Sequence, residues 1–194
     1  MTRVVFINPL DTSASSQGLG IKTPPLNLMY LAGAVEQAGF SPRIIDANLH
    51  NIPPDKITDL ISQLNPALVG LTANTATISE VFKYINKIRF ATPDSIIFLG
   101  GPHATALPKE TLIECRQLDA VVIGEGEETV VDLVRSFSTT DSHWMDAVRG
   151  IAYKRKEGDM TRIMITPPRP FIQDLDKIAS PARHLVPFHE YKLF

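Results

Sequence analysis

Residues 95–105 read SIIFLGGPHAT, a short apolar run that ends in two glycines and a proline. Four comparable runs, each about the length of one strand, occur at 4–7, 43–46, 67–71 and 120–123. They are rich in Val, Ile, Leu and Phe and alternate little with polar residues. Runs of this kind are typical of strands that are buried on both faces of a parallel sheet.

Apolar residues at helical spacing characterise the segments between these runs. The stripes are Leu28, Leu31, Val35 and Ala38; Ile57, Leu60, Ile61 and Leu64; Ile78, Val81, Phe82, Ile85 and Ile88; and Val130, Leu133, Val134 and Phe137. A weaker helix is expected over 108–116. Alternating strands and helices predict an open sheet, because right-handed crossovers leave few other topologies. We therefore predict an α/β, flavodoxin-like, doubly wound sheet of five parallel strands in the order 2-1-3-4-5.

This α/β pattern covers residues 1–140, and two further regions follow it. Residues 141–166 are predicted to form a C-terminal β-hairpin extension, because two strand-like runs flank a turn at Gly158 and Asp159. Residues 167–194 are rich in proline, which favours an extended tail. We expect the apolar side chains of the tail to be exposed, namely Leu185, Val186, Phe188, Tyr191 and Phe194.

Charge and composition exclude several classes of function. The chain has 19 basic and 21 acidic residues and a net charge of −2, so nothing indicates attachment to nucleic acid or to an anionic membrane. The apolar runs are far shorter than the roughly 18 residues of a membrane-spanning helix, and we expect a cytoplasmic protein. The single cysteine, Cys115, excludes a disulfide or a cysteine-held cluster within these residues, and we interpret it as a packing residue of the helix over 108–116.

Ligands of such a sheet bind outside the carboxyl ends of the strands, so the residues after each strand are the functional candidates. Asn8 follows the first strand. The loop that comes next carries Gly18 and Gly20, which lie too far beyond the strand, without a third glycine, to form a dinucleotide-binding turn. A surface loop is the alternative.

Small polar residues follow the third strand: Thr72, Asn74, Thr75 and Thr77. Capping of the next helix requires only one of them. The others leave donors and acceptors for a polar ligand.

Two glycines end the fourth strand and are followed by Pro102 and His103. Gly100 and Gly101 permit backbone conformations closed to other residues and remove two side chains from the crevice. A tight turn is the alternative, and it explains one glycine more easily than two. We interpret His103 as a hydrogen-bonded loop histidine rather than a metal ligand.

The fifth strand is followed by Gly124, Glu125, Gly126, Glu127 and Glu128. Carboxylates at the start of a helix suit the positive end of its dipole, so stabilisation explains part of this pattern. They also argue against a phosphate seated on that helix end. Glu125, between two glycines, is free to turn toward the crevice and accept hydrogen bonds.

Motifs for several other chemistries are absent. A receiver-type phosphorylation domain needs aspartates after the first and third strands and a lysine after the fifth, where this chain has Asn8, Thr72 and Gly124. There is no Walker loop, no G-x-S-x-G elbow and no H-E-x-x-H. We predict no catalytic residue and no protein metal site within these residues.

The strand-end residues together resemble the N-terminal cobalamin-binding domain of the B12-dependent radical SAM family. That family includes methyltransferases and the oxygen-independent magnesium-protoporphyrin monomethyl ester cyclase. The resemblance covers nearly the whole chain in order and spacing. Its matching segments are 24–32, 45–48, 69–72, 99–105, 124–128, 174–176 and 181–183.

The resemblance implies a cobalamin site at the carboxyl ends of the strands, with the nucleotide tail of the cofactor in the crevice beside the third, fourth and fifth. Gly70, Gly100 and Gly101 would make space for that tail. Thr72, Asn74 and Thr75 would hydrogen-bond the cofactor. The other implied cofactor-binding residues are Asn8, Pro102, His103, Gly124, Glu125, Gly126 and Glu127.

Two departures from related proteins refine this expectation. Mutases and methionine synthase carry D-x-H-x-x-G after the first strand, and its histidine is the lower ligand of cobalt. This chain has Asn8-Pro9-Leu10-Asp11 there, so the resemblance implies base-off cobalamin without a histidine ligand. The radical SAM family also holds S-adenosylmethionine and a 4Fe-4S cluster in a C-terminal domain with C-x-x-x-C-x-x-C. We expect that domain as the partner, with residues 167–194 as the linker, or else a stand-alone relative.

Two functions of other classes stay open on the residues alone. A flavodoxin-like domain could bind a flavin or another small ligand at the same strand ends. A non-catalytic interaction domain could carry the same sheet with an empty crevice.

Overall fold

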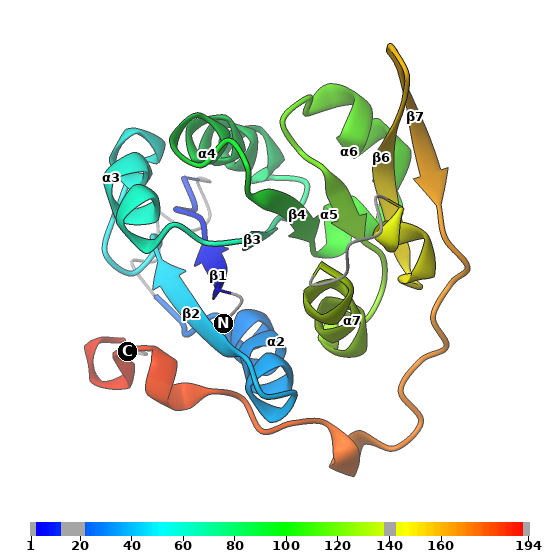
Figure 1. The fold of residues 1–194 in the computed structure, drawn as a ribbon. Coiled ribbons are helices and arrows are strands. Elements are labelled where there is room, and N and C mark those ends of the chain that lie inside the picture. Colours follow the sequence, from blue (N-terminus) through cyan, green and yellow to red (C-terminus); the bar gives the residue numbers. More distant parts are fainter. Residues whose placement is uncertain (1–2, 13–21, 138–142, 192–194) are drawn as a thin grey trace.

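The computed structural model describes residues 3–12, 22–137 and 143–191 (Figure 1). These ranges form one sheet in the order β2-β1-β3-β4-β5-β6-β7. Its strands are β1 (Arg3–Asn8), β2 (Ser41–Asp46), β3 (Leu68–Thr72), β4 (Ile96–Gly100), β5 (Ala120–Val122), β6 (Ile151–Glu157) and β7 (Met160–Ile165). The α-helices are α2 (Leu26–Gln37), α3 (Pro54–Leu64), α4 (Ile78–Ala91), α5 (Pro102–Ala106), α6 (Pro108–Glu114) and α7 (Glu127–Phe137). Gly18 and Gly20 lie outside the described residues.

The five strands β2, β1, β3, β4 and β5 are parallel, as predicted, and their order is the predicted one. The predicted sheet had five strands with a separate hairpin, whereas the observed sheet has seven. The hairpin β6–β7 joins the same sheet, because β6 pairs antiparallel with β5, opposing Val121 to Ala152. Its turn lies at Gly158 and Asp159, as expected. The hairpin thereby covers the edge of β5, which would otherwise present unpaired backbone groups.

Helices pack on both faces of the sheet because successive strand residues point to opposite sides. Phe6 and Phe98 face α2 and α7, whereas Ile7 and Leu99 face α3, α4 and α6. Figure 1 shows these two helical layers on either side of the strands. Both layers bury continuous apolar clusters, as strands buried on both faces require.

Two local predictions for the segment after β4 were incomplete. A short helix that the sequence did not predict, α5, follows the strand directly, with Pro102 at its first position after Gly101 at φ +98°. Cys115 lies just past the end of α6 rather than inside it. The thiol is buried, which agrees with its interpretation as a packing residue, and burial raises its pKa.

The tail from residue 167 runs past α7 and α2 to the edge of β2 (Figure 1). It contains three single turns, η2 (Leu175–Lys177), η3 (Arg183–Leu185) and η4 (Phe188–Glu190). The expectation of exposed apolar side chains was wrong for Val186 and Tyr191, which are buried against Met29.

For the other apolar side chains of the tail, the expectation of exposure holds only in part. Leu185 is half-buried, Phe188 is exposed, and Phe194 lies outside the described residues. The tail is extended as predicted, but it turns back on the domain because it covers apolar surface that α2 and β2 leave open. Among the described residues, no helix is long and apolar enough to cross a membrane.

Candidate functional site

The loops after β3, β4 and β5 meet at one edge of the sheet, because neighbouring parallel strands end on the same side. Between these loops and helices α2 and α7 lies a pocket of about 240 Å³, which we call the strand-end crevice. Its lining residues are Phe6, Asn27, Leu28, Leu31, Leu71, Thr72, Phe98, Gly100, Gly101, Pro102, Val122, Gly124, Glu125, Gly126, Glu127 and Val130.

The crevice is apolar within and polar toward its loops. Phe6 and Phe98 come from the sheet and meet edge to face, with ring centroids 6.3 Å apart. Leu31 of α2 and Val130 of α7 line the helical side. Such a combination of apolar walls with a few polar groups is typical of small-molecule sites.

A second pocket of about 400 Å³ adjoins the crevice on the side of β1, and we call it the β1-side pocket. It shares Asn27, Thr72 and Pro102 with the crevice. Its other lining residues are Asn8, Pro9, Asp11, Thr23, Pro24, Pro25, Leu26, Asn48, Ala73, Asn74 and Thr77. The two pockets together follow the carboxyl ends of β1, β3, β4 and β5.

The three predicted space-making glycines have different surroundings. At Gly100 an added Cβ would meet only the Cβ of Val122, 3.9 Å away, so this position opens into the crevice. At Gly101, φ is +98° and a Cβ would lie 2.5 Å from the Ala73 carbonyl oxygen, so the turn itself requires glycine. At Gly70 a Cβ would lie 2.5 Å from the Phe98 ring, and Gly70 lies behind the lining residues.

The polar residues after β3 bond to helix α2 and to one another within their own loop. The Thr72 hydroxyl oxygen accepts a hydrogen bond from Asn27 Nδ2 at 3.1 Å. Asn74 Oδ1 accepts from the Thr77 backbone N–H at 3.0 Å, which satisfies a free donor at the start of α4. Both pairs leave polar atoms beside the pockets, and Asn74 is exposed.

His103 and Thr75 form a separate pair outside both pockets. His103 is 8% exposed, and its Nδ1 lies 3.3 Å from the Thr75 hydroxyl. His103 is therefore hydrogen-bonded, as predicted, but it lies in helix α5 rather than in a loop. Within the described ranges, no group of three His, Cys, Asp or Glu side chains gathers in a way that could hold a metal ion.

The loop between β5 and α7 is linked to the loop after β4 and to the tail. The Gly124 N–H donates to the Thr105 hydroxyl at 3.1 Å. Glu125 lines the crevice, but its Oε2 already accepts the Ile172 backbone N–H at 2.7 Å. Gly126 and Glu127 also line the crevice.

Asn8 lines the β1-side pocket and bonds to the neighbouring strand. Its Nδ2 donates to Asp46 Oδ1 at 2.9 Å. Asp46 is 4% exposed, and its Oδ2 accepts the Tyr191 hydroxyl at 2.6 Å. Burial is the main cause that raises the pKa of the Tyr191 hydroxyl, and the hydrogen bond to the Asp46 carboxylate is the second cause.

Several lining residues had not been predicted as site residues. Phe6, Phe98, Leu28 and Leu31 had been treated as core or helix-stripe residues, and Asn27 only as part of a matching segment. Strand alternation puts Phe6 and Phe98 on one face, which is a usable signal. The approach of α2 and α7 that closes the crevice depends on packing, and no local pattern gives it.

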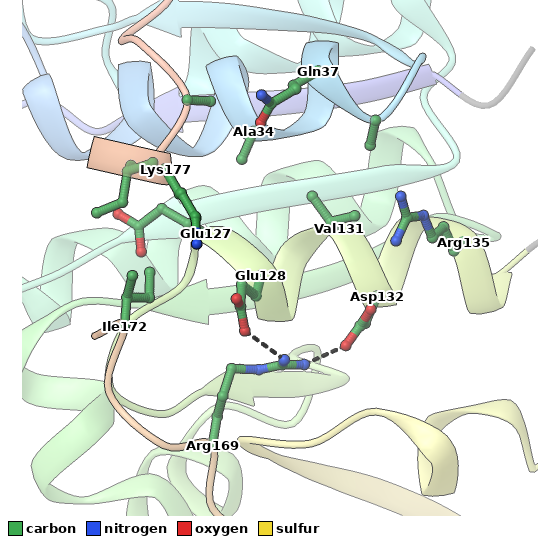
Figure 2. Close-up of a pocket in the computed structure, with 13 residues that line it drawn as sticks. Ala34, Gln37, Glu127, Glu128, Val131, Asp132, Arg135, Arg169, Ile172 and Lys177 are labelled. Atoms are coloured by element: carbon green, nitrogen blue, oxygen red, sulfur yellow. Dashed lines mark hydrogen bonds and ion pairs between the residues drawn. The ribbon is translucent and has the colours of Figure 1, made fainter. Parts of the chain in front are cut away.

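A third pocket, about 460 Å³ and larger than the other two, lies under the tail and is called the tail cavity. Figure 2 shows Arg169 of the tail reaching two carboxylates of α7, Glu128 and Asp132, in this cavity. Its other lining residues are Ala34, Gln37, Ala38, Glu127, Val131, Arg135, Ile172, Lys177, Ile178 and Ala179.

An open, doubly wound sheet whose strand-end crevice is closed by two helices defines a small-ligand-binding domain of flavodoxin-like architecture. The family model described as "B12 binding domain" matches residues 19–134 of this chain. The chain therefore belongs to the B12-binding domain family. The cofactor expected from the sequence, cobalamin, is the one after which this family is named.

Two curated relatives resemble nearly the whole chain. An uncharacterized methyltransferase of Pyrococcus horikoshii is 32% identical over 190 residues, which are 98% of this chain and 40% of the relative. The anaerobic magnesium-protoporphyrin IX monomethyl ester cyclase of Rubrivivax gelatinosus is 33% identical over 180 residues, 91% of this chain and 31% of the relative. The chain thus spans less than half the length of these relatives.

Solved structures of two radical S-adenosylmethionine enzymes share the fold. OxsB with aqua-cobalamin bound has a TM-score of 0.73 at 19% identity, over 94% of this chain and 24% of OxsB. TsrM from Kitasatospora setae, with cobalamin and a [4Fe-4S] cluster bound, has a TM-score of 0.69 at 20% identity, over 93% of this chain and 31% of TsrM.

Proposed function

We propose that this chain binds cobalamin across the carboxyl ends of its parallel strands, in the strand-end crevice and the β1-side pocket. The observation that carries the proposal is the crevice in a B12-binding domain: it is bounded by glycine backbone at Gly100, where an added Cβ would meet only the Cβ of Val122, 3.9 Å away. A ligand can therefore approach the end of β4 closely.

The crevice residues suit a large amphipathic ligand such as cobalamin. Leu31, which is partly exposed, offers an apolar wall for the flat base of the nucleotide tail, and the buried rings of Phe6 and Phe98 lie at the bottom of the crevice. Asn27 and Thr72, at the junction of the two pockets, offer amide and hydroxyl groups for the amides of the corrin. The carboxylates of Glu125 and Glu127 disfavour a phosphate at the start of α7, so the phosphate of the tail is expected nearer β3 and β4.

The positions of the histidines support cobalamin bound without a protein histidine on cobalt, and a crevice that takes the nucleotide base would keep that base off the cobalt as well. All five histidines lie in the described part of the chain, and none lines the crevice or the β1-side pocket. The end of β1 contributes Asn8, Pro9 and Asp11 to the β1-side pocket instead. When bound, cobalamin supplies a cobalt centre that can carry a methyl group, and this chain's residues hold and orient it.

We further propose that the chain is the cofactor domain of a radical SAM enzyme. Residues 1–140 would hold cobalamin, residues 141–166 extend the sheet, and residues 167–194 lead toward the domain that carries S-adenosylmethionine and the 4Fe-4S cluster. The chain matches 40% of the length of one relative and 31% of the other, so the rest of a protein of that length could hold such a domain. Methyl transfer or tetrapyrrole cyclisation is the reaction class that the relatives' names suggest.

Reconstitution tests the proposal against its alternatives. The protein is mixed with hydroxocobalamin, desalted, and examined by absorption spectroscopy, with a parallel sample mixed with FMN. We expect corrin absorbance to co-elute at about one equivalent and FMN to be lost. Retention of FMN alone would favour a flavin-binding domain, and retention of neither would favour an interaction domain.

The state of the cobalt is tested on the loaded protein after reduction to cob(II)alamin. We expect an EPR spectrum without nitrogen hyperfine splitting from a lower axial ligand. Splitting from one strongly coupled nitrogen would show that a histidine or the cofactor's own base binds cobalt, and would overturn the base-off assignment.

A further inference from the structure

The tail is bonded to both sides of the proposed cofactor site. On one side the Ile172 N–H donates to Glu125, which lines the strand-end crevice. On the other side the Tyr191 hydroxyl donates to Asp46, and Asp46 in turn accepts from Asn8, which lines the β1-side pocket. One segment of chain thus reaches a lining residue of each pocket, directly at Glu125 and through one carboxylate at Asn8.

Between these ends the tail packs closely on α2, the helix that also lines the crevice. A Cβ at Gly33 would overlap the carbonyl oxygen of Ser180, so the absence of a side chain allows this approach. The Ala182 N–H then donates to the Met29 carbonyl oxygen at 2.9 Å. Gly33 is a docking point for the tail and lines neither pocket.

The tail has few buried apolar contacts up to Ala179, whereas Ala182, Val186 and Tyr191 beyond it are buried. Between Ile172 and Ala179 it borders the tail cavity, and Phe171 and Leu175 are 73% and 68% exposed. Figure 2 shows the cavity between the tail and the two helices. Segments with few buried apolar contacts open locally at low cost in free energy, so binding at the pockets can shift the docking of the tail.

We propose that residues 169–191 act as a strap whose docking positions Glu125 and Asn8 for cobalamin. Docking of the strap and binding of the cofactor then favour each other. Gly33, Asp46 and Tyr191 are positioning residues that act through the lining residues. This inference rests on the proposed function, because it concerns the affinity of the same site.

The variant Gly33→Ala tests the strap without touching either pocket. Alanine favours a helix interior over glycine, so α2 itself is not weakened. The added Cβ nevertheless blocks the approach of Ser180. We expect the affinity for hydroxocobalamin to fall about fivefold or more, the lower end of typical coupling between sites. Leu175→Ala, which changes an exposed strap side chain, is the matched control and should bind as the wild type does.

A reciprocal measurement separates positioning from a general structural role. Linkage requires that bound hydroxocobalamin slows hydrogen exchange of the strap amides in the wild type. If Gly33→Ala does not fold, Tyr191→Phe takes its place. This variant removes only the hydroxyl bonded to Asp46 and should also lower the affinity for hydroxocobalamin. The strap proposal alone would be overturned if either folded variant kept the wild-type affinity for hydroxocobalamin within about twofold and the ligand left hydrogen exchange of the strap unchanged. Absence of binding to the wild type would overturn the proposed function together with the strap.

Discussion

The strand-end crevice and the tail cavity lie against the same two helices, α2 and α7, but differ in chemistry. The tail cavity is the larger, about 460 Å³ against 240 Å³. Arg169 beside it is already matched by two carboxylates, Glu128 and Asp132. The crevice combines the aromatic rings of Phe6 and Phe98 with the amide of Asn27, the hydroxyl of Thr72 and the backbone of Gly100.

This difference shows that volume alone does not identify a ligand site. In the tail cavity the charged groups stabilise the docked tail through ion pairs, which is a structural role. In the crevice the glycine at position 100 leaves space at the end of a strand, where the fold concentrates loops for binding. Our proposal therefore puts the ligand in the crevice and the adjoining β1-side pocket rather than in the tail cavity.

Filling each pocket in turn tests this assignment most strongly. Gly100→Leu places a side chain in the crevice, and we expect the affinity for hydroxocobalamin to fall about a hundredfold, because the ligand and the new side chain compete for one space. Ala34→Leu adds similar bulk to the tail cavity and is expected to bind as the wild type does. Absorption titrations of both variants provide the comparison, and a larger loss in Ala34→Leu would reverse the assignment.

Replacing each of two glycines by alanine distinguishes a glycine that leaves space for a ligand from one that allows close packing of the core. Gly70→Ala should lower the free energy of unfolding by about 1–3 kcal/mol, because its Cβ would press on the buried Phe98 ring. Gly100→Ala meets nothing closer than 3.9 Å and should change stability by less than about 1 kcal/mol. Urea unfolding measures both values, and equal losses would mean that Gly100 also serves packing.

Removing Arg169 should loosen the first part of the strap, which includes Ile172 and its hydrogen bond to Glu125. The Arg169 side chain is 14% exposed and bonds to Glu128, Asp132 and the Thr129 hydroxyl. Because its partner carboxylates are partly solvated, we expect Arg169→Gln to cost only about 1 kcal/mol of stability. Limited proteolysis should then cut near residues 169–172 faster than in the wild type. Unchanged cleavage there would show that the ion pairs do not hold the tail.

High pH should loosen the end of the strap at Tyr191, and we expect this effect to be smaller than the preceding ones. The pKa of Tyr191 is raised above its ordinary value of 10.0, first by burial and then by Asp46. The unfolded phenol therefore loses its proton first, so this stabilisation is complete below about pH 10 and is lost as the pH rises further. Hydrogen exchange near residue 191, corrected for its intrinsic pH dependence, should show this loss in the wild type and less of it in Tyr191→Phe. Equal profiles would contradict the role of the phenol.

Local sequence patterns predicted the sheet and the elements that surround the site. The apolar runs identified the parallel strands, and convergence of strand ends brought Thr72, Gly100 and Glu125 to one crevice, as expected. Asn8 lines the adjoining pocket. Whether these residues contact cobalamin stays a prediction.

Contacts between distant segments could not be predicted in this way. Tyr191 and Asp46 are 145 residues apart, and Glu125 and Ile172 are 47 apart. Both pairs depend on the path of the tail, which follows from the burial of Val186 and Tyr191 rather than from any local motif. Gly70 was expected to give space to a ligand, yet its neighbour in this structure is the Phe98 ring. Only tertiary packing distinguishes these two uses of glycine.

Amide chemical shifts recorded with and without hydroxocobalamin test the assignment of the site most directly. We predict that the largest changes fall in residues 72–74, 100–102 and 124–127, which line the crevice and the β1-side pocket. The α7 amides beside the tail cavity, 131–135, should change much less. Binding that leaves the three loops unchanged, or that shifts mainly residues 131–135, would contradict a cobalamin site at the strand ends.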